Sequence, residues 1–274
     1  MQLTRRAAVL GSPVTHSLSP VLHGAAYEAL GLTGWSYGRI ECAEDGLAGH
    51  VDGLGAEWAG LSLTMPLKRV ALEVADTASD LAVAVGAANT LVFSSAGRYA
   101  DNTDVAGMVD ALRAAGVARV EAAVVLGAGG TAQAALAALA ELGERTPTVV
   151  VRDPARARAL LDTADRLGVV ATLRRWEAGD ALLGGADVVI STVPRNAADA
   201  LTLDGDRTGG VLFDVVYAPW PTPLAARAQE AGYRVVSGLD LLLHQAGHQV
   251  RLMTGEAAPL DAMRTALDAA VARR

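Results

Sequence analysis

The chain has 274 residues, of which 51% are hydrophobic and 19% are charged. So much apolar material excludes wholesale disorder, and the length favours two domains at about 150 residues each. The 23 Lys and Arg residues against 30 Asp and Glu residues give a net charge of −7, which argues against a general nucleic-acid binder. Cys42 is the single cysteine, so a disulfide-stapled scaffold is excluded and we expect a reducing, cytoplasmic setting. No apolar run reaches the roughly 20 residues of a membrane helix.

The first hundred residues alternate segments of strand and helix character. Strands are expected at residues 7–10, 37–40 and 60–64, because these are short apolar or β-branched runs. A helix is expected at residues 21–30, after the Ser-Pro pair that often begins one, and another around residues 50–54. This alternation predicts an open, mostly parallel sheet of the α/β class.

The middle of the chain carries the clearest pattern. An apolar run of strand length at residues 122–126 leads into a glycine-rich turn, and a helical stretch follows as far as residue 142. Further elements are expected around it: strands at 148–151, 186–190 and 211–213, and helices at 156–167, 105–115 and 239–253. Strand, glycine turn, helix and strand predict a Rossmann-type dinucleotide-binding domain.

The glycine-rich turn fits the dinucleotide fingerprint G-x-G-x-x-G/A, with Gly127, Gly129 and Ala132 at its fixed positions. The first glycine permits a tight turn, the second lets the backbone approach a pyrophosphate, and the helix N-terminus offers N–H groups to the anion. The strand before and the helix after it favour a cofactor site over an ordinary turn. The residues expected at the cofactor phosphates are Gly127, Ala128, Gly129, Gly130 and Thr131.

The end of the second Rossmann strand bears on the choice between NAD and NADP. Arg152 and Arg156 flank the position where a 2′-phosphate would lie, which favours NADP. Asp153 between them would disfavour a dianion, unless it merely starts the next helix. We expect NADP(H) as the cofactor.

Several further segments resemble the shikimate dehydrogenase family, in family order from about residue 9 to residue 250. They are Gly11-Ser12-Pro13-Val14-Thr15-His16-Ser17-Leu18-Ser19-Pro20, Thr64-Met65-Pro66-Leu67-Lys68, Gly86-Ala87-Ala88-Asn89-Thr90, Asp101-Asn102-Thr103-Asp104, Asp214-Val215-Val216-Tyr217, Gly238-Leu239 and Gln245-Ala246. The resemblance implies an NADP-dependent enzyme that reversibly reduces 3-dehydroshikimate to shikimate in chorismate and aromatic amino-acid biosynthesis. It also implies a substrate-binding domain at residues 1–104, completed by helices at 240–274, and an NADP-binding domain at 105–239.

The family's site positions fall on particular residues of this sequence. Lys68 and Asp104 take the catalytic positions, and a lysine is a chemically reasonable proton donor to the alkoxide formed by hydride transfer. The remaining substrate-binding positions are Ser17, Ser19, Thr64, Asn89, Tyr217 and Gln245. The positions on the nicotinamide side include Thr192, Val215 and Gly238.

From the residues alone, purely structural interpretations of several of these positions stay open. A Lys–Asp pair can be purely structural, and Ser19 can be a simple helix cap. His244 and His248 have metal-ligand spacing, but with no glutamate base and no third ligand evident we expect no metal.

The family's usual Asn-Arg-Thr cofactor segment reads Val151-Arg152-Asp153 here, and its frequent Asn is Ser62. The first departure leaves an NAD-dependent quinate/shikimate dehydrogenase as an alternative. A dinucleotide-sensing module without turnover is a second one. Apart from a small-molecule substrate we expect neither nucleic acid nor membrane as a partner, and a monomer or homodimer.

Overall fold

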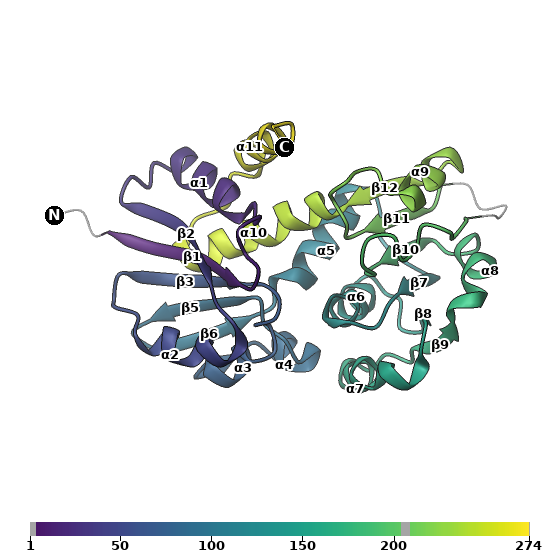
Figure 1. The fold of residues 1–274 in the computed structure, drawn as a ribbon, viewed down its shortest axis with the longest axis horizontal. Coiled ribbons are helices and arrows are strands. Elements are labelled where there is room, and N and C mark those ends of the chain that lie inside the picture. Colours follow the sequence, from purple (N-terminus) through teal and green to yellow (C-terminus); the bar gives the residue numbers. More distant parts are fainter. Residues whose placement is uncertain (1–3, 204–208, 274) are drawn as a thin grey trace. The chain divides into compact units, whose positions relative to one another are not determined.

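The computed structural model describes residues 4–203 and 209–273. The chain divides into two compact units, Met1–Gly107 with Leu242–Arg274 (unit 1) and Met108–Leu241 (unit 2). The divisions fall inside two helices, α5 (Thr103–Ala114) and α10 (Gly238–Thr254). Each unit contains its own sheet, and both are drawn in Figure 1.

Within its described residues, unit 1 holds a six-stranded mixed sheet. Its strands lie in the order β2 (Trp35–Glu41), β1 (Arg5–Gly11), β3 (Trp58–Leu63), β5 (Thr90–Ser94), β6 (Gly97–Asp101) and β4 (Thr77–Ala78). The pairs β1–β2, β1–β3 and β4–β6 are parallel, whereas β5 is antiparallel to both β3 and β6. The expectation of an open, mostly parallel sheet is confirmed.

Strand β1 is buried on both faces, which explains its unbroken apolar run. Ala8 and Leu10 pack in a core with Leu47 and Val51 of α2 (Leu47–Asp52). Ala7 faces the other way and packs with Met253 of α10. Since successive side chains of a strand alternate between the faces, the strand contributes to both cores.

The other helical elements of unit 1 connect and cover these strands. They are α1 (Ser19–Ala29), the 3₁₀ turn η1 (Glu44–Gly46), α3 (Ala71–Val74), α4 (Asp80–Val85) and α11 (Leu260–Val271). Helices α1 and α11 lie side by side although they come from opposite ends of the chain (Figure 1).

Unit 2 has the doubly wound arrangement of the Rossmann fold. In its described residues the strands run in the order β12 (Arg234–Ser237), β11 (Val211–Asp214), β10 (Val188–Ser191), β7 (Ala123–Leu126), β8 (Thr148–Val151) and β9 (Thr172–Arg175). Every pair is parallel. If the strands are numbered from one within this unit and read from β9, the order is 3-2-1-4-5-6. The order in which successive strands are added therefore reverses between β7 and β10.

Helical segments cover both faces of this sheet. They are α6 (Gly130–Glu141), η2 (Pro154–Ala157), α7 (Arg158–Leu167), η3 (Trp176–Ala178), α8 (Gly179–Leu183) and α9 (Pro223–Glu230). Figure 1 shows α6 and α7 on the side of the sheet opposite to α8. Alanine and leucine side chains of α6 are almost all buried, because small residues let this helix pack closely on the strands.

The structure differs from the sequence-based expectation at several elements. The helix expected around residues 50–54 is α2, which begins and ends earlier, at Leu47 and Asp52. The hairpin of β5 and β6 and the edge strands β4, β9 and β12 were not anticipated. Helix α11 lies in the helical region expected at residues 240–274. These three edge strands are two to four residues long and half-exposed, as β9 shows, so they lack the apolar run by which buried strands are recognised.

Candidate active site

Lys68 and Asp104 form an ion pair in unit 1. Lys68 follows β3, and Asp104 is the second residue of α5. The Nζ of Lys68 donates to Oδ2 of Asp104 across 2.6 Å, and the two side chains are 30% and 11% exposed. A pair so far withdrawn from solvent interacts more strongly than an exposed one, and the carboxylate also lies at the positive end of the α5 dipole. The ammonium is therefore held in one place yet still reaches solvent.

Two amide side chains extend this pair. The Nδ2 of Asn89 donates to the second oxygen of Asp104, Oδ1, at 2.9 Å, and also lies 3.3 Å from Oε1 of Gln245. Asn89 precedes β5 and Gln245 lies on α10, so with Lys68 after β3 and Asp104 on α5 four separate segments converge here. Asn89 and Gln245 are both buried. The structure thus brings together four of the residues expected from the sequence: Lys68, Asp104, Asn89 and Gln245.

Ser17 and Ser19 are in contact with each other at the start of α1. The Oγ of Ser17 accepts from the backbone N–H of Ser19 and lies 3.2 Å from its Oγ. The residue at the N-cap position of α1 is Leu18, which makes no side-chain cap bond, and Ser19 is the first residue of the helix, so Ser19 is not the cap that the sequence left open. Ser19 is buried, and its hydroxyl forms a hydrogen bond with Tyr37. Burial raises the pKa of Tyr37, and its hydrogen bonds to Ser62 and Ser19 lower that pKa in part.

Thr64 lies at the end of β3, on the same segment as Lys68, and is half-buried. Its backbone N–H donates to the carbonyl of Leu10, and its own carbonyl accepts from Leu67. These bonds fix the turn that carries Lys68. Tyr217 belongs to unit 2 and follows β11. Its ring lies next to Gly238, since a Cβ added to that glycine would be 3.2 Å from the ring.

His23 is a buried neutral histidine close to this site. Its ring stacks on Tyr37 with centroids 3.9 Å apart. Burial lowers the pKa of His23 from 6.5 to about 3, and a hydrogen bond with Gln249 raises it in part. At neutral pH it therefore carries no charge, which suits a packing role better than that of a proton shuttle.

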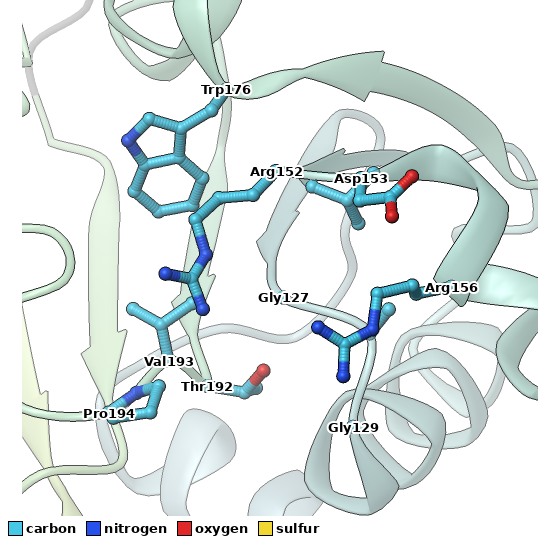
Figure 2. Close-up of a pocket in the computed structure, with 11 residues that line it drawn as sticks. Gly127, Gly129, Arg152, Asp153, Arg156, Trp176, Thr192, Val193 and Pro194 are labelled. Atoms are coloured by element: carbon cyan, nitrogen blue, oxygen red, sulfur yellow. The ribbon is translucent and has the colours of Figure 1, made fainter.

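A cavity of about 650 Å³ opens at the carboxyl ends of β7, β8 and β10 in unit 2 (Figure 2). This edge of a doubly wound sheet, where the chain reverses direction, is the place where such folds bind ligands. The cavity is lined by Gly127, Ala128, Gly129, Val151, Arg152, Asp153, Arg156, Trp176, Thr192, Val193 and Pro194. Six of the expected cofactor residues are among them: Gly127, Ala128, Gly129, Arg152, Arg156 and Thr192.

The two glycines of the fingerprint serve different purposes. Gly127 has φ +102°, and a Cβ there would lie 2.8 Å from Oγ1 of Thr192, so both backbone and packing require glycine. Gly129 is the N-terminal cap position of α6, and a Cβ on it would meet nothing within 4 Å. No neighbour within the protein accounts for Gly129, but a Cβ would fill the space in front of the helix N-terminus. A pyrophosphate fits that space and the N–H groups that face it.

Three charged residues of the described chain line the cavity, and of these Asp153 is engaged in a local hydrogen bond. Oδ1 of Asp153 accepts from the backbone N–H of Ala155 at 3.0 Å and so caps the short helix η2. Figure 2 shows the guanidinium group of Arg156 directed toward Gly129 and that of Arg152 toward Val193 and Thr192, with the Asp153 carboxylate turned away from both. The interpretation of Asp153 as a helix start is confirmed, and the cavity presents two cations.

Trp176 is a lining residue that no sequence motif indicated. It follows β9, the neighbour of β8, so its indole reaches the same edge of the sheet (Figure 2). Recognising strand β9 in the sequence would have placed Trp176 at this edge.

The other residues expected at the cofactor lie outside this lining. Gly130 and Thr131 lie in the first turn of α6, and Val215 and Gly238 lie together at the ends of β11 and β12.

Two family models match parts of this chain. Residues 9–91 match the model of the shikimate dehydrogenase substrate binding domain, and residues 238–267 match that of the shikimate 5′-dehydrogenase C-terminal domain. The shikimate dehydrogenase (NADP(+)) of Maricaulis maris is 39% identical over 95% of this chain and 94% of its own. The chain belongs to the shikimate dehydrogenase family.

Solved structures of the family have the same fold. That of Mycobacterium tuberculosis shikimate dehydrogenase is 46% identical, with a TM-score of 0.87 over 97% of this chain and 99% of its own. The shikimate 5-dehydrogenase of Thermus thermophilus, solved with NADP(H) and shikimate, is 33% identical, with a TM-score of 0.85 over 97% of this chain and 99% of its own. The resemblance and the Rossmann-type fold expected from the sequence are thereby confirmed. Among the described residues no helix is both long and apolar enough to span a membrane.

Proposed function

We propose that this chain is an NADP-dependent shikimate dehydrogenase, which reversibly reduces 3-dehydroshikimate to shikimate on the route to chorismate and the aromatic amino acids. The observation that carries the proposal is the Lys68–Asp104 pair, with 2.6 Å between Nζ and Oδ2, in a member of this family. The relatives named for this activity support it.

Lys68 acts as the proton donor in reduction and as the acceptor in oxidation. When the carbonyl carbon receives hydride, negative charge develops on its oxygen, and an ammonium beside that oxygen stabilises the charge and supplies the proton. Asp104 holds the ammonium in place through Oδ2, while Asn89 engages Oδ1. With both oxygens occupied, the carboxylate cannot rotate away from Lys68.

Substrate binding falls to the domain of residues 1–104, completed by residues 240–274. The groups of this domain that we assign to the ring hydroxyls and the carboxylate are Ser17, Ser19, Thr64, Lys68, Asn89, Asp104 and Gln245. We also assign Tyr217, which lies outside these ranges, to the substrate. Most of them are short polar side chains with fixed neighbours, as in the Ser17–Ser19 and Asn89–Gln245 contacts. Such a site rejects analogues that lack a hydroxyl, because a buried partner is then left unpaired.

NADP(H) binding falls to the domain of residues 105–239. The cofactor supplies the hydride donor or acceptor at its nicotinamide. The α6 N-terminus and the glycine turn receive the pyrophosphate, and Arg152 and Arg156 receive the 2′-phosphate as the two cations of the cavity. Because Asp153 is engaged in capping η2, it does not repel that phosphate at close range.

We place the enzyme in the cytoplasm, acting on a small-molecule substrate as a monomer or homodimer. A reducing compartment suits a chain whose single cysteine, Cys42, is a buried free thiol.

The experiment that tests this function measures initial rates with four combinations, shikimate or quinate with NADP⁺ or NAD⁺. The proposal expects kcat/KM to be highest for shikimate with NADP⁺. A maximum for quinate or shikimate with NAD⁺ would replace it by a quinate/shikimate dehydrogenase. Absence of turnover in all four, with NADP⁺ binding retained, would leave a dinucleotide-sensing module.

A further inference from the structure

Gln249 is a buried amide of α10 that none of the roles above uses. It lies one helical turn beyond Gln245, and it is 1% exposed. Its Oε1 lies 2.7 Å from Oγ of Ser62 and 3.3 Å from Nε2 of His23. Its Nε2 lies 3.1 Å from Oγ1 of Thr90 and 3.2 Å from the carbonyl of Asn89. Both ends of this amide are therefore fully engaged.

The chemistry of an amide fixes the direction of these bonds. An amide oxygen only accepts, so Ser62 and His23 both donate to Gln249. His23 is neutral and carries a single ring proton, which must be on Nε2, and its Nδ1 has no hydrogen-bond partner among the described residues. Since Ser62 uses its proton toward Gln249, Tyr37 Oη is the donor in its 2.5 Å bond to Ser62.

The direction continues on the other side of the amide. Gln249 donates to Thr90, so the Thr90 hydroxyl turns its own proton to Oδ1 of Asn89, 2.9 Å away. The same Oδ1 accepts from the backbone N–H of Thr103 at 2.8 Å. With its oxygen held on this side, the Asn89 amide presents Nδ2 to Asp104.

The result is an unbroken one-way series of donors, from Tyr37 through Ser62, Gln249, Thr90 and Asn89 to Asp104. It ends on a carboxylate, which can only accept, and whose other oxygen binds Lys68. Hydrogen bonds that point the same way polarise one another, and each buried member restricts the next. Removing the middle link takes away the bond that directs the Thr90 proton to Asn89, and leaves the Asn89 oxygen to Thr103, whose N–H and Oγ1 lie 2.8 and 3.1 Å from it.

We infer that Gln249 is a positioning residue for the reaction: through Thr90 it sets the orientation of the Asn89 amide, and through Asn89 that of the Asp104 carboxylate that holds Lys68. This inference rests on the proposed function. A purely structural role, in which Gln249 only ties α10 to the sheet, would cost stability and leave turnover per folded molecule unchanged.

The test compares Gln249→Met with a destabilising control in the same unit. Methionine has similar length but neither donates nor accepts strongly, so it removes the middle link. The control is Ser79→Ala: this side chain caps α4 by accepting from Ala82 at 3.0 Å and donates to Asp101 at 2.6 Å, and among the described residues it has no hydrogen bond to a member of the donor series. Both variants are assayed with shikimate and NADP⁺, and their thermal unfolding is measured in parallel.

Gln249→Met is expected to lower kcat by about 10²-fold, the effect of misplacing a catalytic group by about 1 Å, with a change below about threefold in the KM for shikimate. Ser79→Ala is expected to lower the Tm while kcat stays within about twofold of the wild type. An unchanged kcat in Gln249→Met, or a raised KM at constant kcat, would overturn the inference.

A second measurement does not depend on turnover. The Asn89 side-chain amide resonance, assigned by its loss in Asn89→Asp, reports how firmly the amide is held. Its hydrogen exchange is expected to be at least about tenfold faster in Gln249→Met and unchanged in Ser79→Ala. Wild-type protein without activity would refute the proposed function, and the exchange rates would still decide the inference. Equal protection in the wild type and Gln249→Met would refute it.

Discussion

The Nζ of Lys68 lies 2.6 Å from Oδ2 of Asp104, although 36 positions separate the two residues in the sequence. Lys68 comes from the turn after β3 and Asp104 from the first turn of α5. The antiparallel pairing of β3 with β5, and of β5 with β6, brings the segment before α5 back beside that turn. The pair is thus a product of the hairpin that the sequence pattern did not reveal.

Lys68→Ala is expected to lower kcat by about 10²- to 10⁴-fold, the usual contribution of a general acid or base. The KM for shikimate should change far less, because the proton is transferred only in the transition state. Steady-state kinetics test this, with Arg69→Ala as the matched control, an exposed cation beside Lys68 in sequence. A raised KM at constant kcat would reduce Lys68 to a binding role.

Arg152→Ala and Arg156→Ala are each expected to raise the KM for NADP⁺ about tenfold to a hundredfold, because each removes a charge-assisted contact with the 2′-phosphate. The KM for NAD⁺ should change little. Arg158→Ala, at an exposed arginine outside the cavity lining, is the control. Equal losses with NADP⁺ and NAD⁺ would place the arginines elsewhere on the cofactor.

Asp153→Ala separates the two interpretations of this aspartate. Since its carboxylate caps η2, its removal should lower the Tm slightly and leave the ratio of kcat/KM for NADP⁺ over NAD⁺ within about threefold. A rise of that ratio by about tenfold or more would mean that Asp153 repels the phosphate.

Gly129→Ala and Gly127→Ala are expected to fail in different ways. A Cβ at Gly129 meets no protein atom within 4 Å, so this variant should keep its Tm while the KM for NADP⁺ rises by at least about tenfold. Gly127 has φ +102°, so its alanine variant should lose stability, by about 1–3 kcal/mol. Thermal unfolding and cofactor titration together distinguish the two, and unaltered NADP⁺ binding in Gly129→Ala would contradict the assignment.

His23 should make stability depend on acid pH. The pKa of His23 is about 3 in the folded protein and 6.5 ordinarily. On acidification below pH 6.5, His23 therefore takes up a proton in the unfolded chain but stays neutral in the folded protein. Stability from this group is therefore present above pH 6.5 and falls as the pH drops toward 3. Between about pH 7.5 and pH 5.0 the loss amounts to about 2 kcal/mol. Urea unfolding at the two pH values should show this difference in the wild type and a smaller one in His23→Gln.

The fingerprint glycines and the buried strands of unit 2 were predictable from the sequence because they depend on local properties. A buried parallel strand needs an unbroken apolar run, as in β7, and a tight turn needs a residue that tolerates positive φ, as Gly127 does. The edge strands β4, β9 and β12 and the hairpin of β5 and β6 were missed because short or half-exposed strands leave a weak pattern.

What the sequence determined by itself is the chemistry available: a lysine and an aspartate in family segments, a glycine turn before a helix, and arginines beyond a strand. Only the tertiary structure decided which of these groups act together. In the structure Asp153 caps η2, and Trp176 lines the cavity. Gln249 connects Ser62 with Thr90 through its side-chain amide. Such contacts depend on the direction of hydrogen bonds and on strand pairing between distant segments, and a local pattern of residues carries neither.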